Sequence, residues 1–392
     1  MKDVFLQLVR LGIGTSKDAK ISKDIDWESV EILAKQHRLM GIIYDAVQEL
    51  KSLSGSSQDI LPPLTTWLRW IGEVQLEEAR YSQQWNEARK MAQLFHQNGI
   101  RTYVLKGNVV AECYPEPEHR VSCDLDCFLI NDGSLRQAPG KLSSPQENDN
   151  ENSSWEKGNL LIEDTGGEVE KVFYKNSTFH LPGLTVENHR FLTPFRGNKT
   201  LRRLEVYLQV ELKGCSRSSN GLSGSRFEGT ELWRPPVMVS ALFLIEHAYS
   251  HFLHEGLTWR HVLDWVMFSR KHKNEIDWYV LDALIDEFGF RKFYNVFNEI
   301  GQDAFGNTYN STLSTDSKLS TLNSKLKSLM LNDIWAPLDL HESVRGFKGK
   351  LALVGNTWCA RWKYRYFTNI SWFTALWIQV KGFVFEKNPK LD

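Results

Sequence analysis

The sequence predicts an α+β fold in which a small mixed sheet lies between two helical regions of the chain. Before residue 98, apolar residues recur mainly at helical spacing. Short β-branched and aromatic runs, bounded by Asn-Gly and Pro-Gly pairs, follow between residues 99 and 213. Helical spacing returns after residue 230. We therefore expect an N-terminal helical region (1–98), an α/β core (99–213) and a C-terminal helical domain (230–392).

The N-terminal region carries two helical patterns. From Asp26 to Leu50 the apolar residues fit one stripe of an amphipathic helix; they are Trp27, Val30, Leu33, Ala34, Leu39, Ile42, Ile43 and Val47. Pro62 and Pro63 then open a second, longer helix that runs to about Gln97. The region is therefore predicted to be entirely helical.

The central region carries the predicted strands. An Asn-Gly breaker at residues 98–99 precedes the first of them. The pattern predicts strands over Ile100–Leu105, Cys123–Ile130, Val169–Tyr174 and Leu184–His189, with a short helix over Val109–Cys113. Residues 131–154 are rich in Ser, Asn, Pro, Gly and charge, and we predict that they form a solvated insertion in this core.

The C-terminal region is predicted to consist of helices separated by low-complexity segments. Strong helical periodicity covers Pro236–Arg270. Low-complexity stretches at Gly214–Gly229 and Gly301–Ser328 separate it from the core and from further helices. The glycines at 221–229 lack the Gly-Lys-Ser/Thr ending of a P-loop, so this segment is interpreted as a linker.

Composition places the chain among ordinary globular proteins and makes nucleic acid an unlikely partner. Hydrophobic residues make up 42% and charged residues 24% of the 392 residues, and the formal net charge is −1. A near-neutral chain has no global field that would attract it to nucleic acid. The most apolar stretch, Phe367–Phe385, is interrupted by polar residues, so no transmembrane segment is predicted. The N-terminus lacks a signal-peptide pattern, and the five cysteines have no zinc-ribbon spacing, so we expect buried, reduced thiols and a cytoplasmic location.

One local charge pattern leaves two interpretations open. From Arg345 to Asp392 nine Lys or Arg residues stand against two acidic residues, interleaved with Trp and Tyr. Basic and aromatic residues together occur in nucleic-acid and membrane-surface sites. They also occur on solvated helices that pack through an aromatic seam, and this interpretation is preferred.

The strongest chemical signal is the Asp124-Leu125-Asp126 triplet. In a strand, residues two apart point to the same face, so both carboxylates project together while Leu125 faces the core. Two adjacent negative charges require neutralisation, and a hard divalent cation is a common solution. In phosphoryl transfer such cations bridge the phosphates and offset the charge that develops in the transition state.

A second signal, Lys106-Gly107-Asn108, falls where the first predicted strand should turn into a helix. Glycine allows a phosphate to approach the backbone, the amides of a helix start face an anion, and a lysine can reach a phosphate oxygen. A Lys-Gly pair alone indicates little about function. It indicates a phosphate site more strongly when, as here, a strand precedes it and a helix and an Asp-containing strand follow it.

In this order the chain resembles an uncharacterised nucleotidyltransferase family of the DNA polymerase beta-like superfamily. The motifs that carry the resemblance are Leu105-Lys106-Gly107, Tyr114-Pro115, Arg120 and Asp124-Leu125-Asp126. The family then has an acidic residue two before a histidine, which Glu187 and His189 match here. Leu33–Tyr44 and Leu244–Trp265 resemble the helices on either side, so the resemblance covers Asp26–Arg270 apart from the insertions.

The sequence departs from the family pattern in two places, and one alternative stays open. The usual Gly-Ser or Gly-Gly turn is Gly107-Asn108 here, and the third acid is Glu rather than Asp. Glu205, in another regular segment, competes for the role of third acid. Glu187 is preferred because His189 completes the motif and because a Pro-Gly turn precedes its strand, whereas Arg202 and Arg203 can neutralise Glu205 without any metal.

The resemblance implies a metal-dependent transfer of a nucleoside monophosphate from an NTP, such as ATP, with release of pyrophosphate. It implies Mg²⁺ or Mn²⁺ ligands at Asp124, Asp126 and Glu187, which would be the catalytic residues. The residues implied in nucleotide binding are Lys106, Gly107, Asn108, Arg120 and His189. The acceptor is undefined, with a protein, a sugar and a small molecule as the candidates. The alternative is a catalytically inactive nucleotide-binding or protein-interaction module on the same fold.

Two further pairs have structural interpretations. His247 and His251 are four residues apart on a predicted helix, a spacing that can place two imidazoles on one metal ion. No HExxH motif accompanies them, so packing or hydrogen bonding is the preferred role, and a contact to the nucleotide is the alternative. Arg260 and Asp264 have the same spacing and are interpreted as an intrahelical ion pair.

Overall fold

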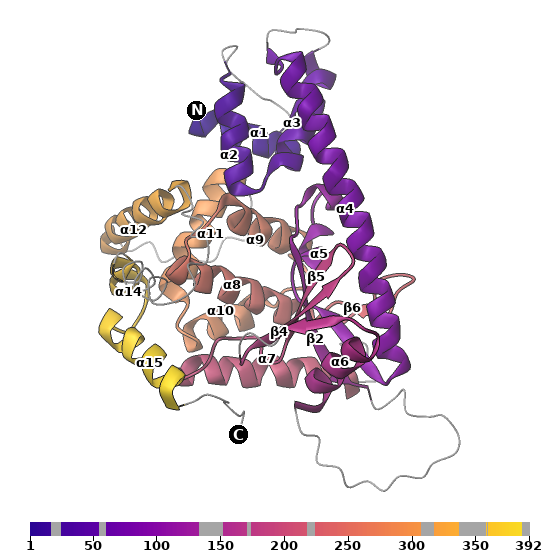
Figure 1. Ribbon diagram of the computed structural model, residues 1–392. Helices are drawn as coiled ribbons and strands as arrows, with labels where there is room; N and C mark the ends of the chain where they lie inside the picture. Colours follow the sequence, from indigo (N-terminus) through magenta and orange to yellow (C-terminus); the bar gives the residue numbers. More distant parts are fainter. Residues whose placement is uncertain are drawn as a thin grey trace, which may run out of the picture. The chain divides into compact units, whose positions relative to one another are not determined.

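Figure 1 shows the computed structural model of the chain. The structure describes residues 1–16, 25–54, 60–132, 152–170, 174–217, 224–306, 317–336, 358 and 360–385. These residues form a mixed α+β fold, which confirms the predicted class. The chain divides into two compact units, and each unit draws on several separate segments.

Unit 1 comprises Met1–Glu77, Val110–Val121 and Leu244–Trp377, and it is helical. The helices that lie in it wholly or in part are α1 (Lys2–Gly12), α2 (Trp27–His37), α3 (Met40–Ser54), α4 (Leu64–Gln97), α5 (Asn108–Ala111), η2 (Pro117–His119), α8 (Val237–His254), α9 (Trp259–Lys271), α10 (Trp278–Glu287), α11 (Arg291–Phe305), α12 (Ser317–Trp335), α14 (Arg361–Phe367) and α15 (Trp372–Phe385). Aromatic side chains fill its interior; Phe5, His37, Trp259 and Trp335 pack edge to face or at a tilt.

Unit 2 comprises Glu78–Val109, Ser122–Phe243 and Ile378–Asp392, and it contains the sheet. The strand order is β3-β4-β5-β2-β1-β6. The strands are β1 (Ile100–Val104), β2 (Asp124–Asn131), β3 (Glu168–Glu170), β4 (Asn176–Leu181), β5 (Leu184–His189) and β6 (Leu232–Trp233). The unit also contains α6 (Asn152–Asp164) and α7 (Lys199–Arg217), together with the C-terminal half of α4 and parts of α5 (Asn108–Ala111), α8 and α15.

One face of the sheet forms the core of unit 2. Leu125, Cys127 and Leu129 of β2 lie on this face with Leu184 and Val186 of β5. They pack with residues of α4 and α6, namely Ala88, Met91, Ala92, Phe95 and Ile162. Because strand side chains alternate, Asp124, Asp126 and Glu187 must lie on the opposite face.

The predicted strands over 100–105, 123–130 and 184–189 are confirmed as β1, β2 and β5, and the long helix is confirmed as α4. The prediction for Val169–Tyr174 is met only by the short β3, since residues 171–173 lie outside the described part. Most of the predicted insertion, residues 133–151, also lies outside it, and α6 begins at its end. The three predicted domain boundaries remain predictions.

Several expectations about single elements were wrong. The stripe from Asp26 to Leu50 is divided between α2 and α3, because Arg38 adopts the left-handed conformation (φ 56°) and ends α2. The predicted helical periodicity over Pro236–Arg270, by contrast, is confirmed, and it is shared by two helices, α8 and α9. Part of the low-complexity stretch Gly301–Ser328 is helical, in α11 and α12. Among the cysteines described, Cys123 is exposed rather than buried.

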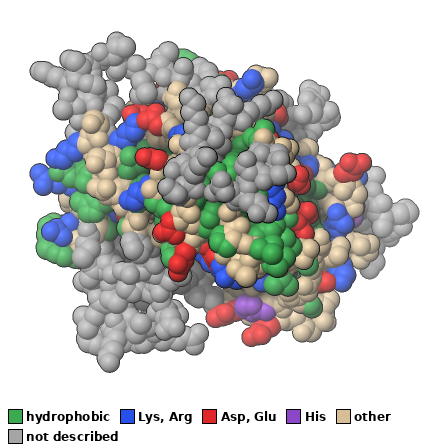
Figure 2. Space-filling view, turned by 90° about the horizontal axis from the view of Figure 1, so that it is seen from above, with side chains coloured by type: hydrophobic (Ala, Val, Ile, Leu, Met, Phe, Trp, Pro, Cys, Tyr) green, Lys and Arg blue, Asp and Glu red, His purple; other side chains and the backbone are tan. Residues whose placement is uncertain are grey.

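The described residues include no membrane-spanning helix, and the face drawn in Figure 2 does not carry a single sign of charge. No helix in the described ranges has the length and apolarity needed to cross a bilayer. On the face drawn in Figure 2, acidic and basic side chains both occur, with hydrophobic side chains between them.

Candidate metal and nucleotide site

Two parallel strands of unit 2, β2 and β5, carry the predicted acidic residues. Their register places Asp126 beside Glu187 and Asp124 beside Thr185. Because directly paired residues of adjacent strands share a face, Asp126 and Glu187 project together. The hairpin that closes at Pro182-Gly183, where Leu181 pairs with Leu184, joins β4 to β5 and sets the register between these two strands.

His189 joins the two carboxylates into one cluster. Its Nε2 atom lies 2.9 Å from Asp126 Oδ1 and 3.5 Å from Glu187 Oε2. One ligand atom from each of these three side chains lies within 4.8 Å of the other two. His189 and Asp126 are buried, whereas the Glu187 side chain is 35% exposed. The cluster can therefore be reached from solvent on the Glu187 side.

Lys106 brings a positive charge to the same face. It follows β1, and the adjacent Leu105 N–H donates to the carbonyl of Asp126. The Lys106 ammonium lies 3.2 Å from Asp126 Oδ2. Gly107 then turns the chain with φ of 62°, which only glycine adopts without strain. Asn108 is buried and begins the four-residue helix α5.

The charges in the cluster shift one another's pKa values. Burial favours the neutral acid at Asp126, but the Lys106 charge and the His189 hydrogen bond outweigh it and lower the pKa of Asp126. The His189 hydrogen bond also lowers the pKa of Glu187. Burial opposes the cationic form of Lys106, yet the three neighbouring carboxylates raise its pKa. The carboxylates of Asp126 and Glu187 are therefore ionised at neutral pH.

The donor set fits a hard divalent cation. Asp126 Oδ2 is buried and accepts no hydrogen bond, and the Lys106 ammonium at 3.2 Å is its ion-pair partner. An ionised buried oxygen without a hydrogen bond has a lone pair that a metal ion can use. With Glu187 alongside and Asp124 on the same face, the site offers carboxylate oxygens, which Mg²⁺ prefers. The assignment of these residues as ligands remains a prediction.

Glu205, the competing third acid, is engaged elsewhere in unit 2. It lies on α7, fully buried, and accepts the backbone N–H groups of Leu192 and Thr193 at 3.0 and 2.6 Å. Gln209 Nε2 donates to it at 2.7 Å. Burial raises the pKa of Glu205. These donors use both carboxylate oxygens, so its observed role is to fix the turn after β5 to α7.

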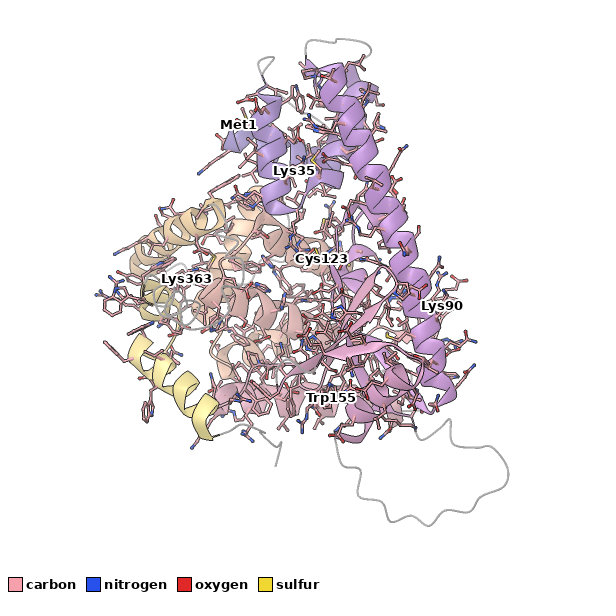
Figure 3. All side chains as sticks on the ribbon, in the orientation of Figure 1. Met1, Lys35, Lys90, Cys123, Trp155 and Lys363 are labelled. Carbon is pink, nitrogen blue, oxygen red and sulfur yellow. The ribbon has the colours of Figure 1, made fainter. Side chains whose placement is uncertain are left out.

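Asn188 stands where the family pattern has an apolar residue, and its buried hydrogen bonds explain why a polar side chain is tolerated there. It points to the core face and contacts Asn159 of α6 at 3.0 Å, and Asn159 in turn accepts from Ser177 of β4. Trp155 Nε1 donates to the Asn188 carbonyl; the position of Trp155 on α6 is labelled in Figure 3. This buried polar network, which the sequence did not reveal, attaches α6 to the strand that carries Glu187 and His189.

Arg120, predicted to bind the nucleotide, belongs to unit 1 and forms a buried ion pair there. Its Nε and terminal nitrogens donate to Asp264 of α9 at 3.0 and 2.6 Å, and the Tyr114 hydroxyl donates to the same carboxylate at 2.8 Å. The predicted intrahelical pair of Arg260 and Asp264 therefore does not describe all the partners of Asp264, which also binds Arg120 and Tyr114. Arg260 acts on Asp264 electrostatically, but its guanidinium donates to the Val121 carbonyl.

The mixed sheet and its cluster of carboxylates, imidazole and ammonium define a class of site suited to metal-dependent chemistry on phosphates. Comparison with family models identifies the particular family: residues 23–300 match the one described as "Uncharacterised nucleotidyltransferase". The match spans most of the chain, which therefore belongs to this nucleotidyltransferase family. Neither the curated proteins nor the solved structures contain a match.

Proposed function

We propose that the protein transfers a nucleoside monophosphate from an NTP to an acceptor and releases pyrophosphate. The observation that carries this proposal is the contact between Asp126, Glu187 and His189 on adjacent parallel strands, with Lys106 at 3.2 Å from Asp126. Membership of a nucleotidyltransferase family supports it independently. ATP is the proposed NTP.

In this proposal Asp124, Asp126 and Glu187 hold Mg²⁺, and Mn²⁺ is an equivalent choice. When bound, the ion supplies positive charge that offsets the charge developing on the triphosphate. His189 keeps the Asp126 carboxylate oriented through its 2.9 Å hydrogen bond. Its Nδ1 atom lies 3.3 Å from the Phe191 carbonyl, to which a protonated Nδ1 donates.

The chain's own groups have separate tasks in the transfer. Lys106 leaves Asp126 and binds a phosphate oxygen of the triphosphate, beside the Gly107 backbone. The acceptor oxygen attacks the α-phosphorus, the bond to the pyrophosphate oxygen breaks, and Glu187 takes the acceptor proton. Glu187 is suited to this because its carboxylate is both ionised and partly exposed. The acceptor is a protein, a sugar or a small molecule.

A second candidate function is nucleotide binding without turnover. It is favoured by the ion pair itself, since Lys106 and His189 already neutralise Asp126 without any metal ion. In that case the fold retains an NTP for interaction with another protein. Calorimetry with ATP and Mg²⁺, combined with a pyrophosphate-release assay, separates the two candidates. Tight binding without release in the presence of cell extract supports the second.

The catalytic proposal is tested by Asp126→Asn and Asp124→Asn, which remove charge and keep shape. We expect each to reduce Mg²⁺-dependent pyrophosphate release by about 100-fold or more, because outer-shell partners of a metal alone cost 10- to 100-fold. The assay uses α-labelled NTPs with cell extract as the source of acceptor. Activity within about tenfold of wild type in both variants would refute the assignment.

The matched control is Asp164→Asn, an exposed carboxylate at the end of α6 in the same unit. It should leave release unchanged. Because Asp126 is buried, the thermal unfolding midpoint of each variant is measured in parallel. A variant that keeps its midpoint and loses release supports the catalytic role.

A further inference from the structure

A second group of metal-ligating side chains lies in unit 1, on α8 and α9. His247 and His251 are one turn apart on α8, and His261 belongs to the first turn of α9. One nitrogen from each lies within 4.8 Å of the others. The ring of His251 is centred 4.4 Å from that of His247 and 4.8 Å from that of His261. We call these three residues the histidine cluster.

The cluster is accessible to an ion. All three histidines are partly exposed, and the His251 side chain is 27% exposed. A tetrahedral ion with ligand bonds of about 2.0–2.1 Å requires nitrogens roughly 3.4 Å apart. The side chains must therefore approach one another by little more than 1 Å at most, which rotations about their own bonds can supply.

Glu255 orients one of the three rings. His251 Nδ1 lies 2.9 Å from Glu255 Oε2. A neutral His251 that donates its Nδ1–H to this carboxylate carries its lone pair on Nε2, which is the form that binds a metal ion. Carboxylates hydrogen-bonded to the second nitrogen of a ligating histidine are a general feature of zinc sites.

Thr258 has both a donor and an acceptor near His261 Nδ1, so either tautomer of His261 can form a hydrogen bond with it. In the structure the Thr258 N–H donates to His261 Nδ1 at 3.1 Å, and the Thr258 hydroxyl oxygen lies 3.0 Å from the same nitrogen. Metal binding through Nε2 requires the proton to move to Nδ1, which then gives up the hydrogen bond from the Thr258 N–H and donates to the Thr258 hydroxyl oxygen instead. The ion then replaces the proton that Nε2 carries in the other tautomer, so binding favours the ligating form.

We propose that the histidine cluster binds one divalent transition-metal ion, Zn²⁺ by the preference of imidazole, through His247, His251 and His261. The site differs in chemistry from the carboxylate cluster of unit 2, since imidazole nitrogens select transition metals and carboxylate oxygens select Mg²⁺. Three protein ligands leave the fourth position to water. The ion ties the end of α8 to the start of α9 across the connection from Glu255 to Thr258.

The test is a titration of metal-stripped, full-length protein with Zn²⁺ against a chromogenic chelator, in the presence of excess Mg²⁺. We expect one Zn²⁺ per chain. His251→Gln and His261→Gln should each weaken binding by about 100-fold or more, and Glu255→Gln by roughly 10- to 100-fold. Bound Co²⁺ should give the intense visible band of tetrahedral coordination.

Three controls locate the ion. Asp126→Asn should bind Zn²⁺ as wild type does, because it alters only the carboxylate cluster. His272→Gln removes an imidazole beyond the other end of α9 and should have no effect. Thr258→Val should weaken binding by about tenfold, and Thr258→Ser, which keeps the hydroxyl acceptor, should restore it.

Two results would overturn the proposal. One is the absence of stoichiometric Zn²⁺ binding, together with a Co²⁺ spectrum of octahedral, solvent-like coordination. The other is binding that Asp126→Asn abolishes and the histidine variants leave intact. The Co²⁺ spectrum of the wild-type protein decides the question even where a variant fails to fold.

Discussion

At the scale of single residues, Lys106 supplies to Asp126 the positive charge that a metal ion would otherwise supply. The ammonium lies 3.2 Å from the carboxylate, and its side chain is 18% exposed. We predict that Lys106→Met lowers the free energy of unfolding in EDTA by about 3 kcal/mol, because it removes the ammonium partner of a buried carboxylate and leaves only His189 beside it. Mg²⁺ should then restore stability to this variant more than it stabilises wild type.

The measurement is denaturant unfolding with and without Mg²⁺. Lys90→Met on α4 is the matched control, since the Lys90 side chain is 72% exposed and its pair with Glu87 lies on the surface. It should change neither quantity. A Lys106→Met protein that is as stable as wild type and indifferent to Mg²⁺ would contradict the proposed competition between ammonium and metal.

His37 gives the molecule a predictable dependence on pH. It is fully buried in unit 1 between Phe5 and Trp335, and burial lowers its pKa to about 4. The unfolded chain, with a pKa near 6.5, therefore binds more protons than the folded chain between these two values. Burial of neutral His37 therefore contributes roughly 3 kcal/mol to the free energy of unfolding above about pH 6.5. This contribution is lost as the pH falls towards 4.

We predict that His37→Leu removes this part of the pH dependence. The free energy of unfolding is measured between pH 4 and 7 for both proteins, and the difference between them is plotted against pH. The carboxylates titrate in both proteins and cancel in the difference. A difference that does not vary with pH would show that burial leaves His37 with an ordinary pKa.

At the scale of elements, local patterns identified the strands whose side chains alternate and missed those supported by distant contacts. The β1 and β2 segments are rich in large apolar residues, and in β5 Leu184 and Val186 alternate with polar residues directly after a Pro-Gly turn, so these patterns were sufficient. In β4 only Phe179 and Leu181 are large and apolar. In α6 the network through Asn159 supports the helix, and hydrogen-bonded polar groups leave no periodic apolar pattern.

The junction between α2 and α3 was missed because no glycine or proline marks it. Arg38 ends α2 with φ of 56° and ψ of 45°, a conformation that is costly for a residue with a β-carbon. We predict that Arg38→Gly stabilises the protein by about 0.5–1 kcal/mol, since glycine is preferred at this position. Ile32→Gly, at a 59% exposed position inside α2, should destabilise it by about 1 kcal/mol.

Thermal or denaturant unfolding checks both signs in the same experiment. The pair separates conformational strain from the general cost of glycine in a helix. Equal destabilisation by the two substitutions would mean that the left-handed conformation of Arg38 carries no strain.

At the scale of the whole molecule, the sequence predicted that the two acids of β2 project to one face, because they are two residues apart on one strand. The choice of Glu187 needed the long-range register of β5 on β2, for which the Pro-Gly turn was indirect evidence. The partner of Arg120 is 144 residues away on α9, and no local signal connects them. Residues far apart in the chain are therefore where prediction from one sequence failed.

The predicted domain boundary at residues 98–99 lies between α4 and the sheet, although the C-terminal half of α4 packs in the hydrophobic core of unit 2. The boundary of the two compact units falls earlier, between Glu77 and Glu78 inside α4. Phe95 of α4 is fully buried in the core of unit 2, with its ring 6.3 Å from that of Phe179 on β4. The C-terminal half of α4 should therefore unfold together with the strands.

We predict that Phe95→Ala lowers the free energy of unfolding by about 3–5 kcal/mol. Hydrogen exchange should accelerate in β1, β2 and β4 as well as in α4, because the cavity opens at the contact of all of them. Leu76→Ala, at a 67% exposed position on the same helix, should leave exchange in the strands unchanged. If Phe95→Ala accelerates exchange in α4 alone, the helix and the sheet are independent and a domain boundary at residues 98–99 is the better description.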